Sequence, residues 1–291
     1  MKGKAMKAVI HPNFSKENCA RITEKVCSML SNMGFELFTY TRMKDKFAFP
    51  ENVSFGEEED IIPDADFIIV IGGDGTILEA SRSAAEYDRP LLGINTGRLG
   101  FMAALEYDEI YRLTGLLSGN YTAQERMLLD CVYLGREGER VYTALNDVVL
   151  SSRFGHMVEF DVKIGDMNVS HIRADGVIFS TPTGSTAYAL SAGGPILSPD
   201  IKCIEMTPVC PHSLFSRTMV FSPEKELEII TDVSRTDVYL TVDGVSMGNI
   251  KEYDKVKIRC SKKVLRLIDT DGSTFFRAVN DKLMRPVKGS S

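Results

Sequence analysis

Residues 66–78 constrain the fold more than any other stretch of this chain, because a buried strand, a glycine turn and a helix start follow one another there. The five apolar residues at 67–71, four of them β-branched, are typical of a strand buried on both faces. Glycines let a backbone approach a phosphate closely, and free N–H groups at a helix N-terminus point at it. The turn consists of Gly72, Gly73, Asp74, Gly75 and Thr76. The stretch therefore predicts a βα unit with an anion site at its turn.

Asp74 is the chemically informative residue of this turn, because its carboxylate adds negative charge beside a bound phosphate. Its position makes sense if the carboxylate holds Mg²⁺ or takes a proton from an attacking hydroxyl. The alternative is an ordinary βα turn in which Asp74 caps the helix. The sequence contains no Gly-x-x-x-x-Gly-Lys-Ser/Thr segment, which excludes a P-loop, and no Gly-x-Gly-x-x-Gly follows the first strand, so a dehydrogenase-type fold is not indicated.

The first 120 residues alternate between strand and helix patterns. Strands are expected at 7–11, 35–40, 66–71 and 90–95, and helices at 15–33, 76–87 and 107–117. Ser15 is the expected cap of the first helix and Gly34 its stop, and residues 41–60 are expected to be irregular, ending in a solvated acidic loop. This alternation predicts a Rossmann-like open α/β sheet with ligands at the carboxyl ends of its strands.

After residue 120 the pattern changes to short strands with turn signals. Hairpin turns are expected at 135–138 and 165–166, with further strands at 227–231, 238–242, 255–260 and 264–268. The sequence therefore predicts an α/β domain at 1–120, a β-rich sandwich domain at 121–268, and a C-terminal segment, 269–291, whose helix packs back on the first domain.

The composition limits the class of protein. The chain has 291 residues, enough for two domains, and its net charge of −6 argues against broad nucleic-acid or membrane binding. No apolar run is long enough to span a bilayer or to form a signal peptide, so we expect a cytoplasmic protein. The six cysteines are scattered and form no Cys-x-x-Cys pair, which makes zinc and a disulfide framework poor interpretations.

A second informative stretch lies at 175–195, where a strand leads into a loop dense in hydroxyls and glycine. Such a loop offers N–H groups and hydroxyls to a ribose or phosphate, and Tyr188 offers a ring face to a base. The alternative is a turn with Ser and Thr caps. Upstream, Asn146 and Asp147 stand side by side within an apolar strand, where an amide could read an adenine edge and a carboxylate could accept from ribose hydroxyls. The alternative there is a turn or bulge at a strand edge.

Together these stretches resemble the NAD kinase family over about residues 65–244. The turn at 72–76 is similar to the family's acidic glycine loop, Asn146-Asp147 to its nucleotide-binding pair, and residues 175–195 to its longest signature. The segments at 95–101, 156–160 and 207–212 also fit. One departure from the family pattern is Val245: the family often has Gln at this position, after an Asp-Gly pair, and the valine lacks the amide that Gln would offer to a ligand.

The resemblance implies a kinase that phosphorylates the 2′-hydroxyl of the adenosine ribose of NAD with ATP and Mg²⁺, at a site between the two domains. Asp74 would be the base, Gly72, Gly73, Gly75 and Thr76 would hold phosphate, and Phe101 would pack near the adenine. The resemblance further implies that the dinucleotide is bound by Asn146, Asp147, Thr183, Thr186, Ala187, Tyr188 and Ser191. His156, Arg173 and Asp175 would reach the other end of the ligand from a partner subunit in a homodimer or homotetramer.

Two other functions stay open at this point. A related kinase could act on a lipid or sugar phosphate, although the sequence shows no membrane-facing segment. A non-catalytic dinucleotide sensor would be expected to have lost the acid of the glycine loop, yet Asp74 is present.

Overall fold

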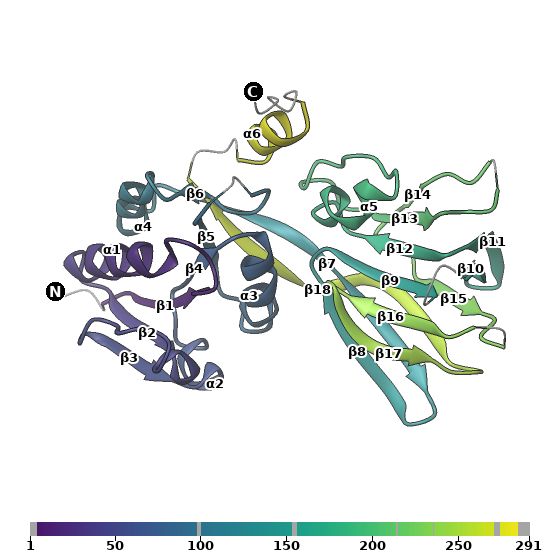
Figure 1. Ribbon diagram of the computed structural model, residues 1–291, viewed down its shortest axis with the longest axis horizontal. Helices are drawn as coiled ribbons and strands as arrows, with labels where there is room; N and C mark the ends of the chain where they lie inside the picture. Colours follow the sequence, from purple (N-terminus) through teal and green to yellow (C-terminus); the bar gives the residue numbers. More distant parts are fainter. Residues whose placement is uncertain are drawn as a thin grey trace. The chain divides into compact units, whose positions relative to one another are not determined.

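The computed structural model describes residues 5–97, 100–152, 156–213, 215–234, 236–270 and 274–284 (Figure 1). The chain divides into two compact units. Unit 1 consists of Met1–Glu125 and Leu265–Ser291, and unit 2 of Arg126–Val264.

Unit 1 contains the predicted parallel sheet. Its strands, in spatial order, are β6 (Leu105–Glu106), β5 (Leu91–Asn95), β4 (Phe67–Gly72), β1 (Lys7–Pro12), β2 (Glu36–Tyr40) and β3 (Val53–Gly56). Every pair among them is parallel. All six residues of β4 are buried at the centre of the sheet, as expected for an apolar β-branched run with neighbours on both sides. The open, parallel α/β character predicted for this part of the chain is confirmed.

Helix α1 (Cys19–Asn32) begins four residues later than predicted. Ser15 does not cap it, because the Ser15 hydroxyl donates to Oδ1 of Asn13 at 2.6 Å. Asn18 stands at the N-cap position instead, with a φ of 62°. The helix stops at the predicted place, where Gly34 adopts a φ of 86° that favours glycine.

The prediction of an irregular stretch at 41–60 is wrong. It holds a short 3₁₀ helix η1 (Thr41–Met43), strand β3 and the start of helix α2 (Glu58–Ile61). The acidic run was expected to be a solvated loop, but its last three acids form the first turn of α2, where negative charge is favourable. Ile61 and Ile62 are buried and anchor this turn. The helix predicted at 107–117 is present as η2 (Ile110–Thr114) followed by α4 (Gly115–Ser118).

Unit 2 contains two antiparallel sheets that share a core. One sheet has the order β14 (Met219–Phe221), β13 (Ile204–Val209), β12 (Gly176–Ser180), β9 (Asp147–Ser152), β16 (Val238–Val242) and β17 (Val245–Ile250). The other includes β11 (Met167–Ala174), β10 (Val158–Ile164), β15 (Leu227–Thr231), β18 (Lys255–Asp269), β7 (Thr122–Gly135) and β8 (Gly138–Ala144). Phe160 of the second sheet and Phe179 of the first lie in the same buried cluster, which confirms the predicted sandwich.

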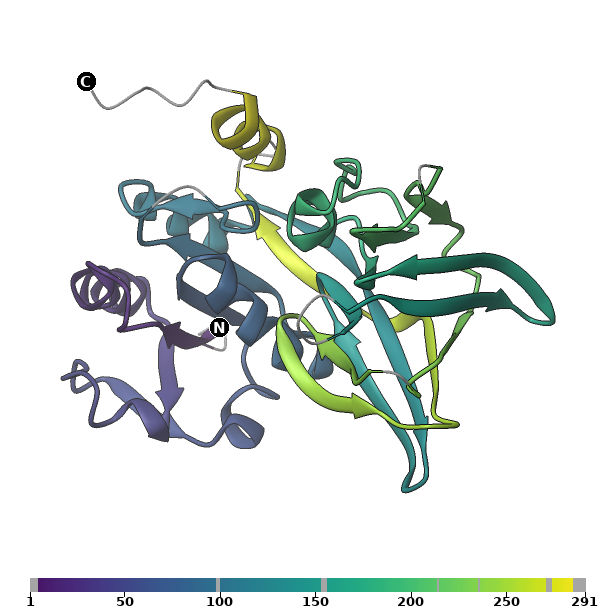
Figure 2. The ribbon, with the colours of Figure 1, turned by 45° about the vertical axis from the view of Figure 1, so that its right-hand side comes forward.

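The hairpin turns predicted at 135–138 and 165–166 are both present, and Figures 1 and 2 show β7 and β8 as a long ribbon. The two strands predicted at 255–260 and 264–268 form a single strand, β18. No glycine or proline separates them, and the polar residues at 261–263 continue the strand through a solvent-exposed stretch.

The C-terminal segment of unit 1 is helical, as predicted. It comprises α6 (Thr274–Val279) and a π-helical turn, η4 (Asn280–Met284), while Ser273 lies outside the described residues. Phe275, Ala278 and Val279 are buried and hold the segment in place. Among the described residues, no helix combines the length and apolar character needed to cross a membrane.

Candidate active site

The glycine turn of unit 1 is shaped to leave open space over a helix N-terminus. Strand β4 ends at Gly72, and helix α3 (Asp74–Glu86) begins two residues later. A Cβ atom at Gly72 would lie 2.4 Å from Oγ1 of Thr76, so only glycine fits there. At Gly73 and Gly75 a Cβ atom would meet nothing within 4 Å, which leaves the first turn of the helix open to a ligand. This arrangement is suited to an anion.

Asp74 does not cap helix α3. Gly73 occupies the N-cap position, and Asp74 is the first helical residue, with no side-chain capping bond. Its carboxylate turns instead to the loop that follows β5, where Oδ2 accepts from the N–H of Phe101 at 2.9 Å and Oδ1 from the N–H of Met102 at 3.2 Å. Two backbone donors therefore fix the orientation of the carboxylate.

Lys282 also reaches this carboxylate, although no motif in the sequence points to it. Its Nζ lies 3.9 Å from Oδ2 of Asp74 and 4.5 Å from the centroid of the Phe101 ring. The C-terminal segment gives no motif signal, so only the tertiary structure reveals this lysine. Phe101, which the resemblance placed near the adenine, here contacts Lys282 with its ring and Asp74 with its N–H.

Thr76 is a structural member of the turn. It is buried, and its Oγ1 accepts from Nδ2 of Asn13 at 3.0 Å. Asn13 follows β1, so this bond ties the glycine turn to the end of the neighbouring strand. The backbone N–H of Thr76 donates to the carbonyl of Gly73 at 2.9 Å, whereas the hydroxyl, which accepts from Asn13, still has a proton to donate.

In unit 2, the amide–carboxylate pair sits on a turn held by Asp243. The buried carboxylate of Asp243 accepts from the backbone N–H groups of Leu145, Asn146 and Asp147 at 2.9, 2.8 and 3.1 Å. The residue lies in the left-handed region, with a φ of 49°. In the sequence, Asp243 stands out only as the acid of the Asp-Gly pair that precedes Val245. Three charge-assisted bonds give Asp243 the role of fixing the Asn146-Asp147 backbone.

Asp147 is 5% exposed, and no donor among the described residues bonds to its carboxylate. Burial, together with the charge of Asp243, raises the pKa of Asp147 to about 7. A buried carboxylate without a donor is costly unless a ligand supplies one. Two ribose hydroxyls are donors of the required kind, which favours the ligand-binding interpretation over an edge bulge.

The hydroxyl-rich loop at 181–191 divides into structural and open residues. Thr181 donates to the carbonyl of Leu145 at 2.5 Å, and Ser185 donates to the carbonyl of Pro182 at 2.7 Å. A Cβ atom at Gly184 would lie 2.1 Å from the carbonyl oxygen of Asn146, so the loop packs directly on the amide–carboxylate turn. Most of the predicted contacts are in this loop: Thr183 is buried, Thr186 and Ala187 are half-buried, and Tyr188 and Ser191 are exposed. The structure therefore brings these residues together with Asn146 and Asp147.

The other three predicted residues lie elsewhere in unit 2. Strand β9 pairs with β12 so that Asp147 faces Ser180 while Ser151 faces Gly176. The N–H of Ser152 donates to the carbonyl of Asp175 at 2.9 Å, which puts Asp175 five residues along the strand from Asp147, or about 17 Å away. One subunit does not bring Asp147 and Asp175 together.

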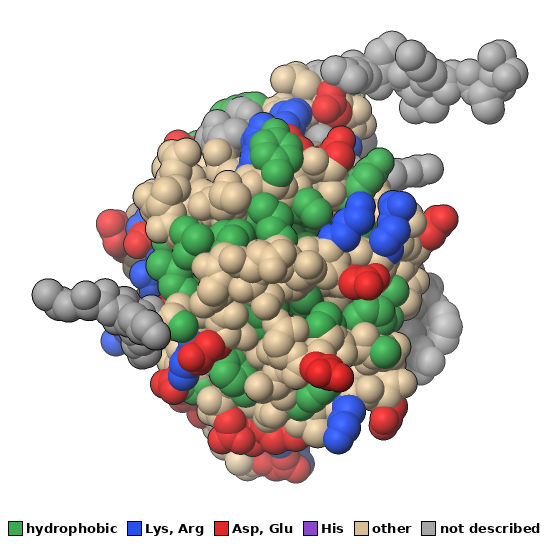
Figure 3. Space-filling view, turned by 90° about the vertical axis from the view of Figure 1, so that its left-hand side faces the viewer, with side chains coloured by type: hydrophobic (Ala, Val, Ile, Leu, Met, Phe, Trp, Pro, Cys, Tyr) green, Lys and Arg blue, Asp and Glu red, His purple; other side chains and the backbone are tan. Residues whose placement is uncertain are grey.

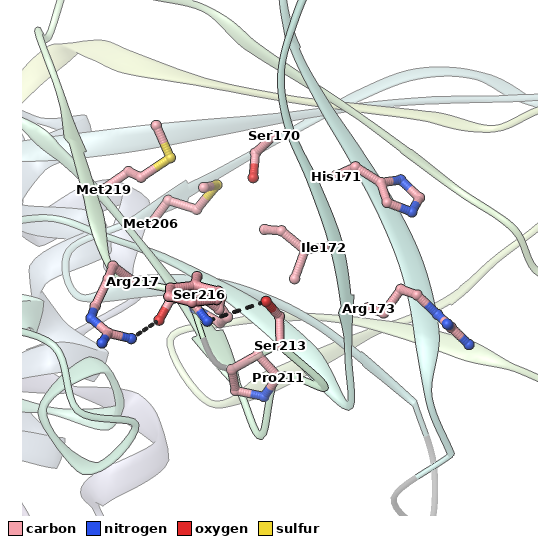
Figure 4. Close-up of a pocket in the computed structure, with 12 residues that line it drawn as sticks. Ser170, His171, Ile172, Arg173, Met206, Pro211, Ser213, Ser216, Arg217 and Met219 are labelled. Atoms are coloured by element: carbon pink, nitrogen blue, oxygen red, sulfur yellow. Dashed lines mark hydrogen bonds between the residues drawn. The ribbon is translucent and has the colours of Figure 1, made fainter.

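Arg173 lies beyond Asp175 on β11, beside a pocket of about 270 Å³ (Figure 4). In this view the side chains of His171 and Arg173 extend away from Met206 and Met219. Their partners are on β10, where Nε of Arg173 lies 3.2 Å from Glu159 and Nδ1 of His171 lies 2.8 Å from Asp161. Alternation along the strand places both side chains on the same face. His156 is exposed just before β10.

The donor set suits a magnesium ion that arrives with a nucleotide. Within the described ranges, no group of three or more His, Cys, Asp or Glu side chains could hold a metal ion. Asp74 is the one acid of the open glycine turn. Mg²⁺ commonly uses one or two carboxylates together with substrate phosphates and water, and this turn fits that mode.

The fold and the site together define a class of protein, a nucleotide-binding phosphotransferase without a P-loop. Unit 1 fixes an acid in an open turn of a parallel sheet that suits an anion. Unit 2 presents an amide, a buried carboxylate and hydroxyls. Comparison of the sequence with known protein families narrows this class. The family model described as the ATP-NAD kinase N-terminal domain matches residues 8–121, and that of the C-terminal domain matches residues 145–270. The chain therefore belongs to the NAD kinase family, whose reaction is the phosphorylation of NAD to NADP with ATP.

Individual relatives agree with this assignment. The NAD kinase of Natranaerobius thermophilus is 37% identical over 279 residues, which cover 94% of this chain and 96% of that protein. The NAD kinase of Symbiobacterium thermophilum is 40% identical over 240 residues, with 81% and 82% covered. The crystal structure of yeast NADH kinase complexed with NADH matches with a TM-score of 0.86 at 25% identity and covers 100% of this chain and 90% of that one. An NAD kinase from Archaeoglobus fulgidus in complex with ATP shares the fold, with a TM-score of 0.68 at 23% identity over 94% and 96% of the two chains.

Proposed function

We propose that this chain transfers the γ-phosphoryl group of ATP to the 2′-hydroxyl of the adenosine ribose of NAD, with Asp74 as the general base. The observation that carries the proposal is the Asp74 carboxylate, fixed by two backbone N–H groups beside an open glycine turn. The family assignment supports the substrate pair.

The proposed roles follow from the surroundings of each residue. The turn formed by Gly72, Gly73, Gly75 and Thr76 binds phosphate at the start of helix α3. Asn146 reads the adenine and Asp147 accepts from ribose hydroxyls, while Thr183, Thr186, Ala187 and Tyr188 line the dinucleotide and Ser191 lies further along it. Val245 begins β17 with an apolar side chain that is 48% exposed, so this position offers no amide to the ligand.

In the proposed step, Asp74 takes the proton of the 2′-hydroxyl as its oxygen forms a bond to the γ-phosphorus. The bond between that phosphorus and the bridging oxygen breaks, ADP leaves with the electron pair, and Asp74 later gives the proton to solvent. Positioning and charge neutralisation supply most of the catalysis in such a transfer. A divalent cation such as Mg²⁺ would be carried by ATP and would neutralise charge on its phosphates, which leaves Asp74 free to act as the base.

We also propose a homodimer or homotetramer, in which His156, Arg173 and Asp175 act on a ligand bound by a neighbouring copy. This proposal is supported by the distance between Asp147 and Asp175, which lie about 17 Å apart along β9. At that separation, two different subunits can bring the two residues to one ligand more readily than a single subunit can. Analytical ultracentrifugation with and without NAD, paired with dilution assays, tests this, because binding to the assembled form should favour it. A monomer with full specific activity would remove these three residues from the shared site.

The location is proposed to be cytoplasmic. All six cysteines are free thiols, four of them buried, which suits a reducing compartment.

A coupled assay for NADP formed from NAD and Mg-ATP tests the proposed function directly. Parallel reactions with diacylglycerol or a sugar phosphate as acceptor test the lipid and sugar kinase alternatives. A thermal-shift gain with NAD but no turnover of ATP would favour a non-catalytic sensor. NADP formation with none of the other acceptors phosphorylated is the expected result.

A further inference from the structure

The glycine turn poses an electrostatic problem that backbone N–H groups alone do not solve. Asp74 and a bound phosphate both bring negative charge to the same turn, and the whole chain carries a net charge of −6. Figure 3 shows the Lys and Arg side chains of one face scattered singly or in small groups among apolar and acidic ones. An individual basic residue or a metal ion can supply the neutralising charge at the turn.

Lys282 is positioned to supply that charge. Its Nζ lies 3.9 Å from Oδ2 of Asp74, the oxygen that also accepts from the N–H of Phe101. The same Nζ lies 4.5 Å from the centroid of the Phe101 ring, a distance at which the ring face attracts a cation. One lysine thus contacts both the carboxylate and the loop residue that orients it.

The packing of the C-terminal segment fixes where Lys282 lies. Phe275, Ala278 and Val279 of α6 are buried, and the ring centroid of Phe275 lies 6.5 Å from that of Phe101. Arg277 forms an ion pair with Glu109 at 3.8 Å. Lys282 follows on the π-helical turn η4, a type of turn that is frequent at functional sites.

Stability does not explain the ion pair. The side chains of Lys282 and Asp74 are 33% and 30% exposed, and partly exposed pairs of this kind contribute little to folding. A lysine placed beside an oriented carboxylate and over an aromatic ring is better explained by the reaction.

We propose that Lys282 is a positioning residue for phosphoryl transfer, which holds the ionised Asp74 carboxylate in place and offsets its charge while phosphate occupies the turn. This inference rests on the proposed role of Asp74. Lys282 keeps its own proton throughout: the hydroxyl proton goes to Asp74, and the leaving electron pair goes to ADP. The loss of Lys282 should therefore act on the rate and on the binding of ATP, and not on the binding of NAD.

The test compares Lys282→Met with wild type in the NADP-forming assay. We expect kcat to fall on the order of 10–100-fold and KM for ATP to rise, with KM for NAD unchanged, since a displaced catalytic group costs about that much. Lys282→Arg should recover part of the rate. Lys282→Cys treated with 2-bromoethylamine regains a lysine-like ammonium group and should recover more, with equally treated wild type as the control for modification of the exposed Cys210.

Two further variants separate the effect of the Lys282 charge from an effect of disturbing the C-terminal segment. Leu283→Ala removes a partly exposed apolar side chain next to Lys282 and should keep kcat, and Lys44→Met removes an exposed lysine elsewhere in unit 1 and should do the same. Equal losses in Lys282→Met and Leu283→Ala, or a wild-type kcat in Lys282→Met, would overturn the inference. Failure of wild type itself to form NADP would instead reject the proposed function.

Discussion

A Cβ atom built on Gly100 would lie 2.2 Å from Oδ1 of Asp74. The loop after β5 can therefore bring the N–H groups of Phe101 and Met102 to the carboxylate only because residue 100 has no side chain. Two glycine-rich loops that are separate in the sequence meet at one acid, and each depends on the other for its geometry.

Gly100→Ala should displace the Asp74 carboxylate and lower turnover by roughly 100-fold, the scale expected when a catalytic group moves by about 1 Å. Gly97→Ala is the matched control, because a Cβ atom at Gly97 would meet nothing within 4 Å. The assay is NADP formation, with circular dichroism melts to compare folding. Similar rates for the two variants would contradict the steric argument.

Asp74→Asn should abolish most of the turnover and leave NAD binding largely intact, because the proposed NAD contacts lie in unit 2. The amide cannot take the hydroxyl proton, and loss of a general base typically lowers the rate on the order of 10²–10⁴-fold. The side-chain NH₂ group of the introduced asparagine would also face the N–H of Phe101 or of Met102, which now donates to the carboxylate, so that hydrogen bond would be lost. Steady-state kinetics together with calorimetric titration of NAD check this, and a near-wild-type kcat would reject the role.

Asp147→Ala should weaken NAD more than ATP. A buried carboxylate that binds ribose hydroxyls makes charge-assisted hydrogen bonds worth roughly 1.5–3 kcal/mol each. Separate KM measurements for the two substrates show which one is affected. If KM for ATP rises and KM for NAD does not, the amide–carboxylate pair serves the phosphoryl donor.

The stability of unit 2 should fall as the pH rises from about 4.5 to 7. Burial raises the pKa of Asp147 to about 7, with a further contribution from the charge of Asp243, and burial also raises the pKa of Glu205 to about 7. In this range the unfolded chain has lost both protons while the folded chain still holds them, so each step up in pH favours unfolding. The shift at Asp147 sets an upper limit of about 4 kcal/mol for its part.

Urea denaturation of wild type and of the Asp147→Asn, Glu205→Gln double variant at pH 5.5 and pH 8 checks this expectation. Both amides stay neutral across the range, so the variant should show a flatter pH dependence than wild type. A parallel pH dependence in the two proteins would show that neither carboxyl group holds its proton in the folded state.

The sequence predicted the elements whose signal is local. The apolar, β-branched run at 67–71 can bury both faces only in a central strand, and β4 is fully buried. The glycines of the turn predicted an open helix N-terminus, because a backbone without side chains exposes its N–H groups, and the space over Gly73 and Gly75 is open. The turn residues at 165–166 likewise predicted the hairpin of β10 and β11.

The predictions from sequence missed or misplaced the elements whose stability comes from tertiary contacts. The acidic run at 56–60 looked like solvated loop, but burial of Ile61 and Ile62 orders its end as a helix. Ser15 had the right residue type for a cap, yet the nearby Asn13 takes its hydroxyl bond. The strands predicted at 255–260 and 264–268 are one, because pairing with neighbouring strands carries the chain through the polar residues between them.

The candidate site shows the same division. The sequence alone singled out Asp74, Asn146 and Asp147. An acid in a glycine turn and polar residues in an apolar strand are unusual, and a few neighbouring residues are enough to recognise them. The groups that orient them are 27 or more residues away: Phe101 and Lys282 for Asp74, and Asp243 for Asn146 and Asp147. Hydrogen bonds and ion pairs between such distant residues leave no periodicity in a single sequence. The sequence therefore determined which groups we propose to carry the chemistry, and only the tertiary structure decided what holds them in place.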